Sequence, residues 1–132
     1  MLYLWIIFYA KVKPSGKGQA GQRRHYQKGA IMRFMITVRF EVEAGNAAVS
    51  AGRVGPMLQS VLGQLKPEAA YFGPIDGGRG AYLVVNIDDV SQIPSISEPF
   101  FQNLGATVTF TPVMTAEDLA KGIAMIPAAS AP

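Results

Sequence analysis

Apolar and polar side chains alternate along the stretch from Met32 to Val42. The apolar side chains at its even positions are Met32, Phe34, Ile36, Val38, Phe40 and Val42. The odd positions are polar, with Met35 as the exception. Successive side chains of a β-strand point to opposite faces, so the pattern predicts a strand with one face in a core and the other turned outward.

A helical pattern follows this strand. The apolar residues that recur at the spacing of one helix face are Val54, Leu58, Val61 and Leu65. Asn46 belongs to a residue type that caps helix N-termini, so we expect helical structure to begin there. Pro56 predicts a kink or a restart, because proline fits the first turn of a helix but not its interior. We expect Lys66-Pro67 to end the helix.

The next segment, Ala69 to Asn86, predicts a β-hairpin, because Asp76-Gly77-Gly78-Arg79 is a turn signal between two strand-like runs. We take Gly77-Gly78 as the two-residue loop. The facing pairs are then Phe72 with Leu83 and Ala70 with Val85 on one face, and Tyr71 with Val84 and Gly73 with Tyr82 on the other. The second of these strands is apolar on both faces, which is typical of a central strand covered on both sides.

A second helical region opens at Asp88–Ser91. Its two prolines, Pro94 and Pro99, predict short turns that become a regular helix only near Ser97–Pro99, with Gly105 as the stop. Ala106–Pro112 then alternates again and predicts a strand with its threonines outward. Thr115–Asp118 resembles a capping box for a short last helix that runs to about Lys121.

The predicted order of elements is strand, helix, strand, strand, helix, strand. This βαββαβ order predicts an α+β, ferredoxin-like fold with an antiparallel sheet in the strand order 4-1-3-2. In that order the second and fourth strands are edges, where a missing backbone N–H is tolerated. Pro74 and Pro112 fall in those two strands, and the two central strands contain no proline. The domain is expected over residues 32–122, with a C-terminal tail at 123–132.

Charge divides the chain of 132 residues into two unlike parts. Residues 1–31 contain six of its twelve basic residues and none of its nine acidic ones. The overall charge of +3 therefore comes from this N-terminal part, the remaining domain is mildly acidic, and we expect no nucleic-acid partner. The chain has no cysteine, which fits a reducing compartment, so we expect a cytoplasmic protein.

Three interpretations fit residues 1–31. The apolar run Leu2–Ala10 is too short to span a membrane, which needs about 20 apolar residues. It would suit an interfacial anchor beside basic residues. The segment Pro14–Gly29, rich in Gly, Gln, Lys and Arg, would suit a disordered basic extension. We favour a third interpretation, in which Met32 is the natural start, because the ordered pattern begins there abruptly.

No strong catalytic, phosphate-binding or metal-binding motif is present, so we predict no cofactor and no metal. The sheet face opposite the helices is the candidate site. Its outward residues combine tyrosines, threonines and arginines around a small apolar area, which suits a small aromatic or acidic ligand. The candidate ligand-binding residues are Thr37, Arg39, Tyr71, Tyr82 and Thr109. The alternative is a subunit interface without a ligand.

Four segments carry a resemblance to a family of small bacterial proteins of unknown function. They are Met32–Val38, Lys66–Phe72, Ile93–Phe101 and Thr111–Leu119. Over about Met32–Lys121 the chain is similar in layout to the dimeric α+β barrels, which include muconolactone isomerase and cofactor-independent monooxygenases. The resembling motifs are structural, so they imply no active-site residue. Some such proteins are called pantothenate synthetases, but that enzyme resembles a nucleotidyl transferase with paired histidines, and the single histidine here, His25, precedes the domain.

Two functional classes follow. In the first, the domain is a small homodimeric binding or regulatory module that pairs through the open sheet face. In the second, that face forms the pocket of a cofactor-independent isomerase or monooxygenase for a small aromatic or lactone-like substrate. Arg39 and Tyr82 would then bind the substrate, and Tyr71 would assist proton transfer. The homodimer is expected in both cases, because a single sheet with helices on one side leaves apolar side chains in water.

Overall fold

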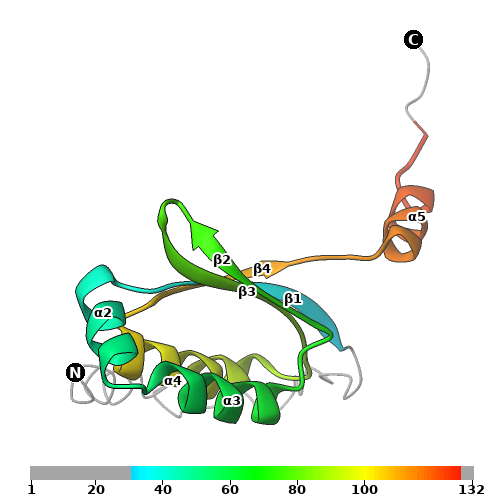
Figure 1. Ribbon diagram of the computed structural model, residues 1–132. Helices are drawn as coiled ribbons and strands as arrows, with labels where there is room; N and C mark the ends of the chain where they lie inside the picture. The colour runs from blue at the N-terminus through cyan, green and yellow to red at the C-terminus, as the bar shows by residue number, and fades with distance from the viewer. Residues whose placement is uncertain (1–30, 129–132) are drawn as a thin grey trace, which may run out of the picture.

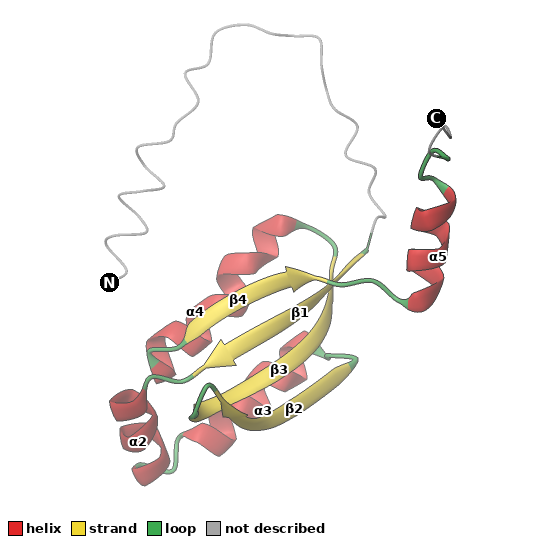
Figure 2. Ribbon diagram, turned by 90° about the horizontal axis from the view of Figure 1, so that it is seen from above, coloured by secondary structure: helices red, strands yellow, loops and turns green. Residues whose placement is uncertain are grey.

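One antiparallel sheet organises the chain, of which the computed structural model describes residues 31–128. Its strands are β1 (Met32–Arg39), β2 (Ala69–Ile75), β3 (Gly78–Ile87) and β4 (Thr107–Pro112). They lie side by side in the order β2-β3-β1-β4, with β1 and β3 in the centre (Figure 2). The predicted α+β, ferredoxin-like class and the predicted order 4-1-3-2 are confirmed, and Pro74 and Pro112 lie on the two edge strands.

The helices divide between one face of the sheet and its end. They are α2 (Val42–Ser50), α3 (Val54–Leu65), the short 3-10 turn η1 (Val90–Gln92), α4 (Ile93–Leu104) and α5 (Ala116–Ala124). Figure 1 shows α3 and α4 below the sheet, while none of the helices in residues 31–128 covers its upper face. At the far right of the same view, α5 stands away from the rest of the domain.

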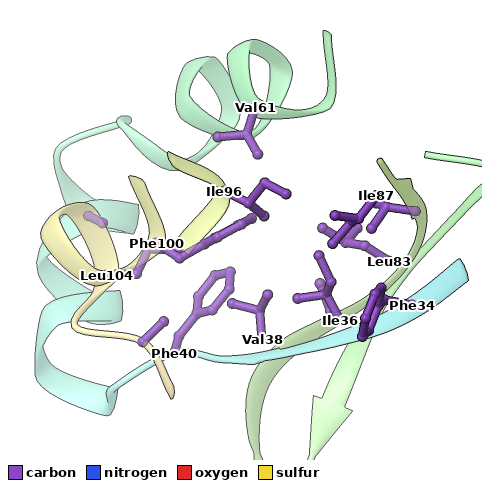
Figure 3. Close-up of a cluster of buried hydrophobic side chains, with 14 residues drawn as sticks. Phe34, Ile36, Val38, Phe40, Val61, Leu83, Ile87, Ile96, Phe100 and Leu104 are labelled. Carbon is purple, nitrogen blue, oxygen red and sulfur yellow. The ribbon is translucent and has the colours of Figure 1, made fainter. Parts of the chain in front are cut away.

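The core lies between the sheet and α3 and α4 (Figure 3). β1 sends Phe34, Ile36 and Val38 into this layer, as the alternation predicts, and Ile36 and Val38 are fully buried. Met32, the first even position, is exposed instead. From the other side, Phe100 and Leu104 of α4 meet them and are also fully buried. Each such side chain contributes about 1.5–3 kcal/mol to stability relative to an exposed position.

The first strand is shorter than predicted, because a helix cap interrupts it. Glu41 accepts hydrogen bonds from the backbone N–H groups of Glu43 (3.1 Å) and Ala44 (2.6 Å), and α2 begins at Val42. The predictions of strand at Val42 and of an N-cap at Asn46 are therefore wrong. Asn46 lies inside α2, where its side-chain oxygen accepts a hydrogen bond from Arg79 Nη1 at 2.9 Å.

The restart predicted near Pro56 is confirmed. Helix α2 ends at Ser50, Gly52 takes a positive φ of 67°, and α3 begins at Val54. Pro56 is therefore the third residue of α3, in the first turn, where no intrahelical N–H donor is lost. The helix ends at Lys66 in the left-handed conformation, as expected for the Lys66-Pro67 stop.

The hairpin turn lies one residue earlier than predicted. Its loop is Asp76-Gly77, and Ile75 pairs with Gly78. Both loop residues have positive φ, 48° and 78°, as a type I′ turn requires and as Asp-Gly favours. The pairing consequently differs by two residues from the predicted one, and Tyr71 lies opposite Tyr82 rather than Val84. Because the shift is even, each side chain keeps its predicted face.

Helix α4 is regular from Ile93, so the prediction of a late start near Ser97–Pro99 is wrong. Pro94 is tolerated in the first turn, and Pro99 removes one backbone hydrogen bond inside the helix. Burial of Ile96 and Phe100 on either side of Pro99 offsets that loss. Gly105 ends the helix with a φ of 54°, as predicted.

The last helix has the predicted capping box, formed by Thr115 and Asp118. It runs to Ala124, three residues past Lys121, so the tail predicted to begin at residue 123 is helical at its start. The interpretations of residues 1–31 concern a segment of which only Ile31 is among the described residues, and residues 129–132 also lie outside them.

Candidate binding site

The sheet face turned away from α3 and α4 is called here the open face. By the alternation of the strands and their register, it presents the side chains of Arg33, Met35, Thr37, Arg39, Tyr71, Tyr82, Val84, Asn86, Thr107, Thr109 and Thr111. The even shift in the hairpin register leaves this set as predicted. Figure 1 shows that the β2–β3 hairpin curves upward at one end of this face and that α5 stands beyond the other.

Four of the five predicted ligand-binding residues form one row across the sheet, called here the central row. Tyr71 pairs with Tyr82, Tyr82 with Thr37, and Thr37 with Thr109, so one residue comes from each strand. Directly opposed side chains in a sheet lie about 5 Å apart at their Cβ atoms. The two tyrosines are 68% and 40% exposed. The row thus offers two accessible rings with phenol hydroxyls, followed by two hydroxyls on short side chains.

The fifth predicted residue, Arg39, lies in the next row. It pairs with Gly80 of β3 and Thr107 of β4, one same-face step of about 7 Å along the strand from the central row. Its Nη2 donates to the backbone carbonyl of Asp76 at 3.2 Å, which directs the guanidinium toward the hairpin turn. The remaining guanidinium N–H groups have no hydrogen-bond partner among the described residues. Arg39 is therefore a cation beside the tyrosines whose remaining N–H groups are available as hydrogen-bond donors.

An apolar row lies on the other side of the central row. Val84 pairs with Met35 of β1 and with Ala69 of β2, and Met35 pairs with Thr111 of β4. Val84 and Met35 are half-buried although no helix of the described part of the chain covers this face. The open face therefore runs from the cation at the hairpin end, across aromatic rings and hydroxyls, to an apolar strip.

A polar cluster lies beyond the apolar strip, at the β1 start. Arg33 Nε donates to both carboxylate oxygens of Glu68, at 3.1 and 3.0 Å, and its Nη2 donates to Oε1 at 2.9 Å. Asn86 Nδ2 donates to the same carboxylate at 2.8 Å. The Arg33 hydrogen bonds, and after them the one from Asn86, lower the pKa of Glu68, and the Glu68 carboxylate raises the pKa of Arg33. Glu68 was not among the predicted site residues, since it precedes β2 and lies 35 residues from Arg33.

Two hollows border these surfaces. One of about 520 Å³ lies against the Arg33–Glu68 cluster, between the β1 start and α5, and includes Pro112 and Asp118. The other, of about 670 Å³, lies on the helix side beneath the hairpin, between Phe40, Leu58 and Phe72 among others. Neither hollow contains a residue of the central row, so a site on the open face would need a second surface above it to become enclosed.

Within residues 31–128, no three histidines, aspartates or glutamates lie close enough together to hold a metal ion. In the same part of the chain, no helix has both the length and the apolarity needed to cross a membrane.

Comparisons with known proteins place the domain in a family without an assigned activity. Searches of curated proteins and of solved structures gave no significant match. A family profile, described as a domain of unknown function (DUF3303), matches residues 32–126. The match begins at the first residue of β1 and extends past the end of α5. Since it covers well over half of the chain, this protein belongs to the DUF3303 family of domains of unknown function.

Proposed function

We propose that this domain is a homodimeric binding module, whose site for a small aromatic or acidic molecule lies on the open face and is enclosed when two copies meet there. The observation that carries the proposal is the central row, which aligns Tyr71, Tyr82, Thr37 and Thr109 across all four strands. Ligand sites combine apolar and aromatic surface with a few convergent polar groups, and the row with its neighbours has this composition.

Each part of the open face has a defined task in this proposal. The exposed rings of Tyr71 and Tyr82 stack on an aromatic ligand, and the hydroxyls of Thr37 and Thr109 fix its orientation. Arg39 binds a carboxylate through the guanidinium N–H groups that the Asp76 carbonyl leaves free. Aromatic acids combine both features, so they are the first class of compound to test.

The ion pair at the β1 start supports the dimer. Covering a charged side chain is unfavourable unless that charge is paired and hydrogen-bonded. Arg33 is already held by Glu68 in a bidentate contact. A second copy can therefore cover this end of the open face without isolating a cation. Among the described residues, Arg39 is then the open-face charge that a ligand or a partner would have to satisfy.

The same geometry favours binding over proton transfer. The open-face carboxylate of Glu68 lies by the Asn86–Arg33 pair, two rows from the central row. Its hydrogen bonds stabilise the ionised form and lower its pKa, which makes it a weak proton acceptor. Tyr71 has no hydrogen bond to another described side chain. These observations support a binding module, whereas an isomerase or monooxygenase would need a positioned base.

A thermal-shift screen of small aromatic acids tests the proposal. A ligand at about one hundred times its Kd adds about 2.7 kcal/mol to stability, which is several degrees for a domain of this size. We expect at least one compound to raise the melting temperature of the wild type and to lose most of that effect with Arg39→Ala. Arg53→Ala is the matched control, because Arg53 is an exposed arginine at the start of α3, away from the open face. No response in the wild type, or an equal response in both variants, would contradict the proposed site.

A further inference from the structure

Helix α5 presents an apolar stripe for which the described part of the chain supplies no covering surface. Leu119 and Ile123, one helical turn apart, are 49% and 57% exposed, and Met114 just before the helix is 63% exposed. No residue of the helix is buried. Figures 1 and 2 both show α5 standing clear of the sheet and of the other helices. A helix of nine residues is marginal in water by itself, so its stability depends on packing.

The start of α5 is held in place at one end of the open face. The Val113 backbone N–H donates to the Arg33 carbonyl at 3.0 Å, which extends the pairing of β4 with β1. Asp118 lies 3.8 Å from Arg33 Nη1 and also accepts from Thr115. These contacts leave Val113–Thr115 as a short connection and direct the helix beyond the end of the sheet. The stripe consequently does not reach the central row of its own chain.

We infer that α5 is an exchanged arm: it docks on the open face of a second copy, at the hairpin end, and forms the outer wall of that copy's ligand site. The inference rests on the proposed function, because it assumes that two open faces meet. Consider a two-fold axis that lies between the two facing sheets and is perpendicular to their strands. Such an axis places the β1 start of one copy above the β1 end of the other. The α5 stripe then faces the partner's Tyr71 and Tyr82, which are themselves exposed.

Charge selects this arrangement over the alternative. An axis parallel to the strands would place the two α5 helices side by side, and both carry Glu117 and Asp118 in the first turn. The crossed arrangement instead brings that negative turn toward the partner's Arg39. For Arg39 the described residues supply a backbone carbonyl but no carboxylate. Attraction between unlike charges favours the crossed pairing, and repulsion between like charges disfavours the parallel one.

A spin-label experiment on mixed chains tests the exchange. Because the chain has no cysteine, an introduced cysteine is the single site of labelling. Lys121→Cys carries the label on the exposed, polar side of α5, opposite the stripe. Labelled chains are mixed with isotope-labelled wild-type chains that carry no spin label. We expect paramagnetic broadening of wild-type amides at the hairpin end, at Arg39, Gly73 and Gly80. A label at Gln64→Cys on the helix side is the control and should leave these amides sharp.

Each other outcome of this experiment contradicts the exchange. Broadening confined to the β1 start would indicate the parallel arrangement. Broadening can also arise within the spin-labelled chain itself, which is measured after that chain is diluted into chains without a spin label. Such broadening would show that α5 folds back on its own domain. A dimeric sample without broadening between chains would show that the dimer forms without the arm. A monomeric wild type would instead contradict the dimer of the proposed function.

A pair of variants gives a second test by light scattering. Leu119→Asp places a charge in the stripe, and Ala124→Asp places the same charge outside the stripe, about 100° around the helix from Ile123. We expect the first variant to dissociate at a protein concentration at least tenfold higher than the wild type, and the second to dissociate like the wild type. Equal dissociation of both variants would overturn the arm, while a persistent dimer in both would leave the sheet contact standing without it.

Discussion

Gly80 is the residue on which the hairpin end of the open face depends most closely. An added Cβ at this position would lie 2.5 Å from Ile75 Cδ1 and 2.7 Å from the Val38 carbonyl oxygen. The Ile75 side chain therefore occupies the space above Gly80, and it is buried although none of the described helices covers that face. The curved hairpin brings Ile75 over Gly80, and this is possible because Gly80 has no side chain.

We predict that Gly80→Ala lowers the free energy of unfolding by about 1–3 kcal/mol, because the carbonyl oxygen of a central strand cannot move aside. Gly73→Ala is the matched control: Gly73 pairs with Gly80, and an added Cβ there meets nothing within 4 Å. Denaturant unfolding of both variants measures the difference. Equal stability of the two variants would contradict the account of this contact.

Glu68 gives the second prediction at the scale of single residues. Its pKa is lowered in the folded protein, so its ionisation adds stability above the ordinary pKa of about 4.3, and that stability is lost as pH falls through the lowered value. Glu68→Gln should therefore be less stable than the wild type at neutral pH and should lose less stability below about pH 4. Glu43→Gln, which removes an exposed carboxylate of α2 outside this cluster, is the control for the loss of one negative charge. Parallel profiles for the wild type and Glu68→Gln would refute the role of the ion pair.

At the scale of elements, the strands were predictable because their signal has a period of two residues. The alternation in Met32–Arg39 and Thr107–Pro112 places each side chain on a face without any knowledge of its neighbours. The register between β2 and β3 was harder to predict from the sequence than the strands themselves. Two loops of equal length, Asp76-Gly77 and Gly77-Gly78, fit the same sequence, and the difference between them lies in which residues adopt positive φ.

Helix boundaries failed where a side chain or the core overrides the local signal. Glu41 is an uncommon residue type at a helix N-cap, so the sequence favoured Asn46, and α2 began four residues before that residue. Pro99 argues locally against a helix, but Phe100 and Leu104 are fully buried against the sheet and hold α4 together. Both outcomes depend on contacts that a single sequence does not display.

The type I′ turn carries the prediction at this scale. Gly77→Ala should destabilise the domain by about 1–2 kcal/mol, because Gly77 has a φ of 78° and a Cβ is unfavourable there. Gly63→Ala is the contrasting control, since Gly63 lies inside α3 with open space around it, and alanine should add about 0.5–1 kcal/mol. Thermal unfolding distinguishes the two signs. Destabilisation by Gly63→Ala, or none by Gly77→Ala, would contradict these backbone assignments.

At the scale of the whole molecule, the composition of the open face could be predicted but its connections could not. The alternation of the strands was enough to place four residues on the open face: Tyr71, Tyr82, Thr37 and Thr109. Their alignment in one row depends on three strand registers, which the alternation does not determine. The bidentate contact between Arg33 and Glu68 also links positions far apart in the sequence. In the proposed dimer, this ordered ion pair would let a second copy cover the charged end of the sheet face.

The dimer is the central claim, since both the enclosed site and the exchanged arm require it. Val84 lies in the apolar strip of the open face, where an aspartate would introduce a charge twice across a two-fold interface. Ser60→Asp adds the same charge on the exposed side of α3 and is the control. We expect Val84→Asp to be a folded monomer by circular dichroism and Ser60→Asp to keep the wild-type assembly.

Light scattering coupled to gel filtration of the wild-type protein at tens of micromolar is the most direct measurement. A mass equal to two chains is the predicted result, with Val84→Asp at the mass of one chain and Ser60→Asp at that of two. A wild type with the mass of a single chain would contradict the pairing of open faces.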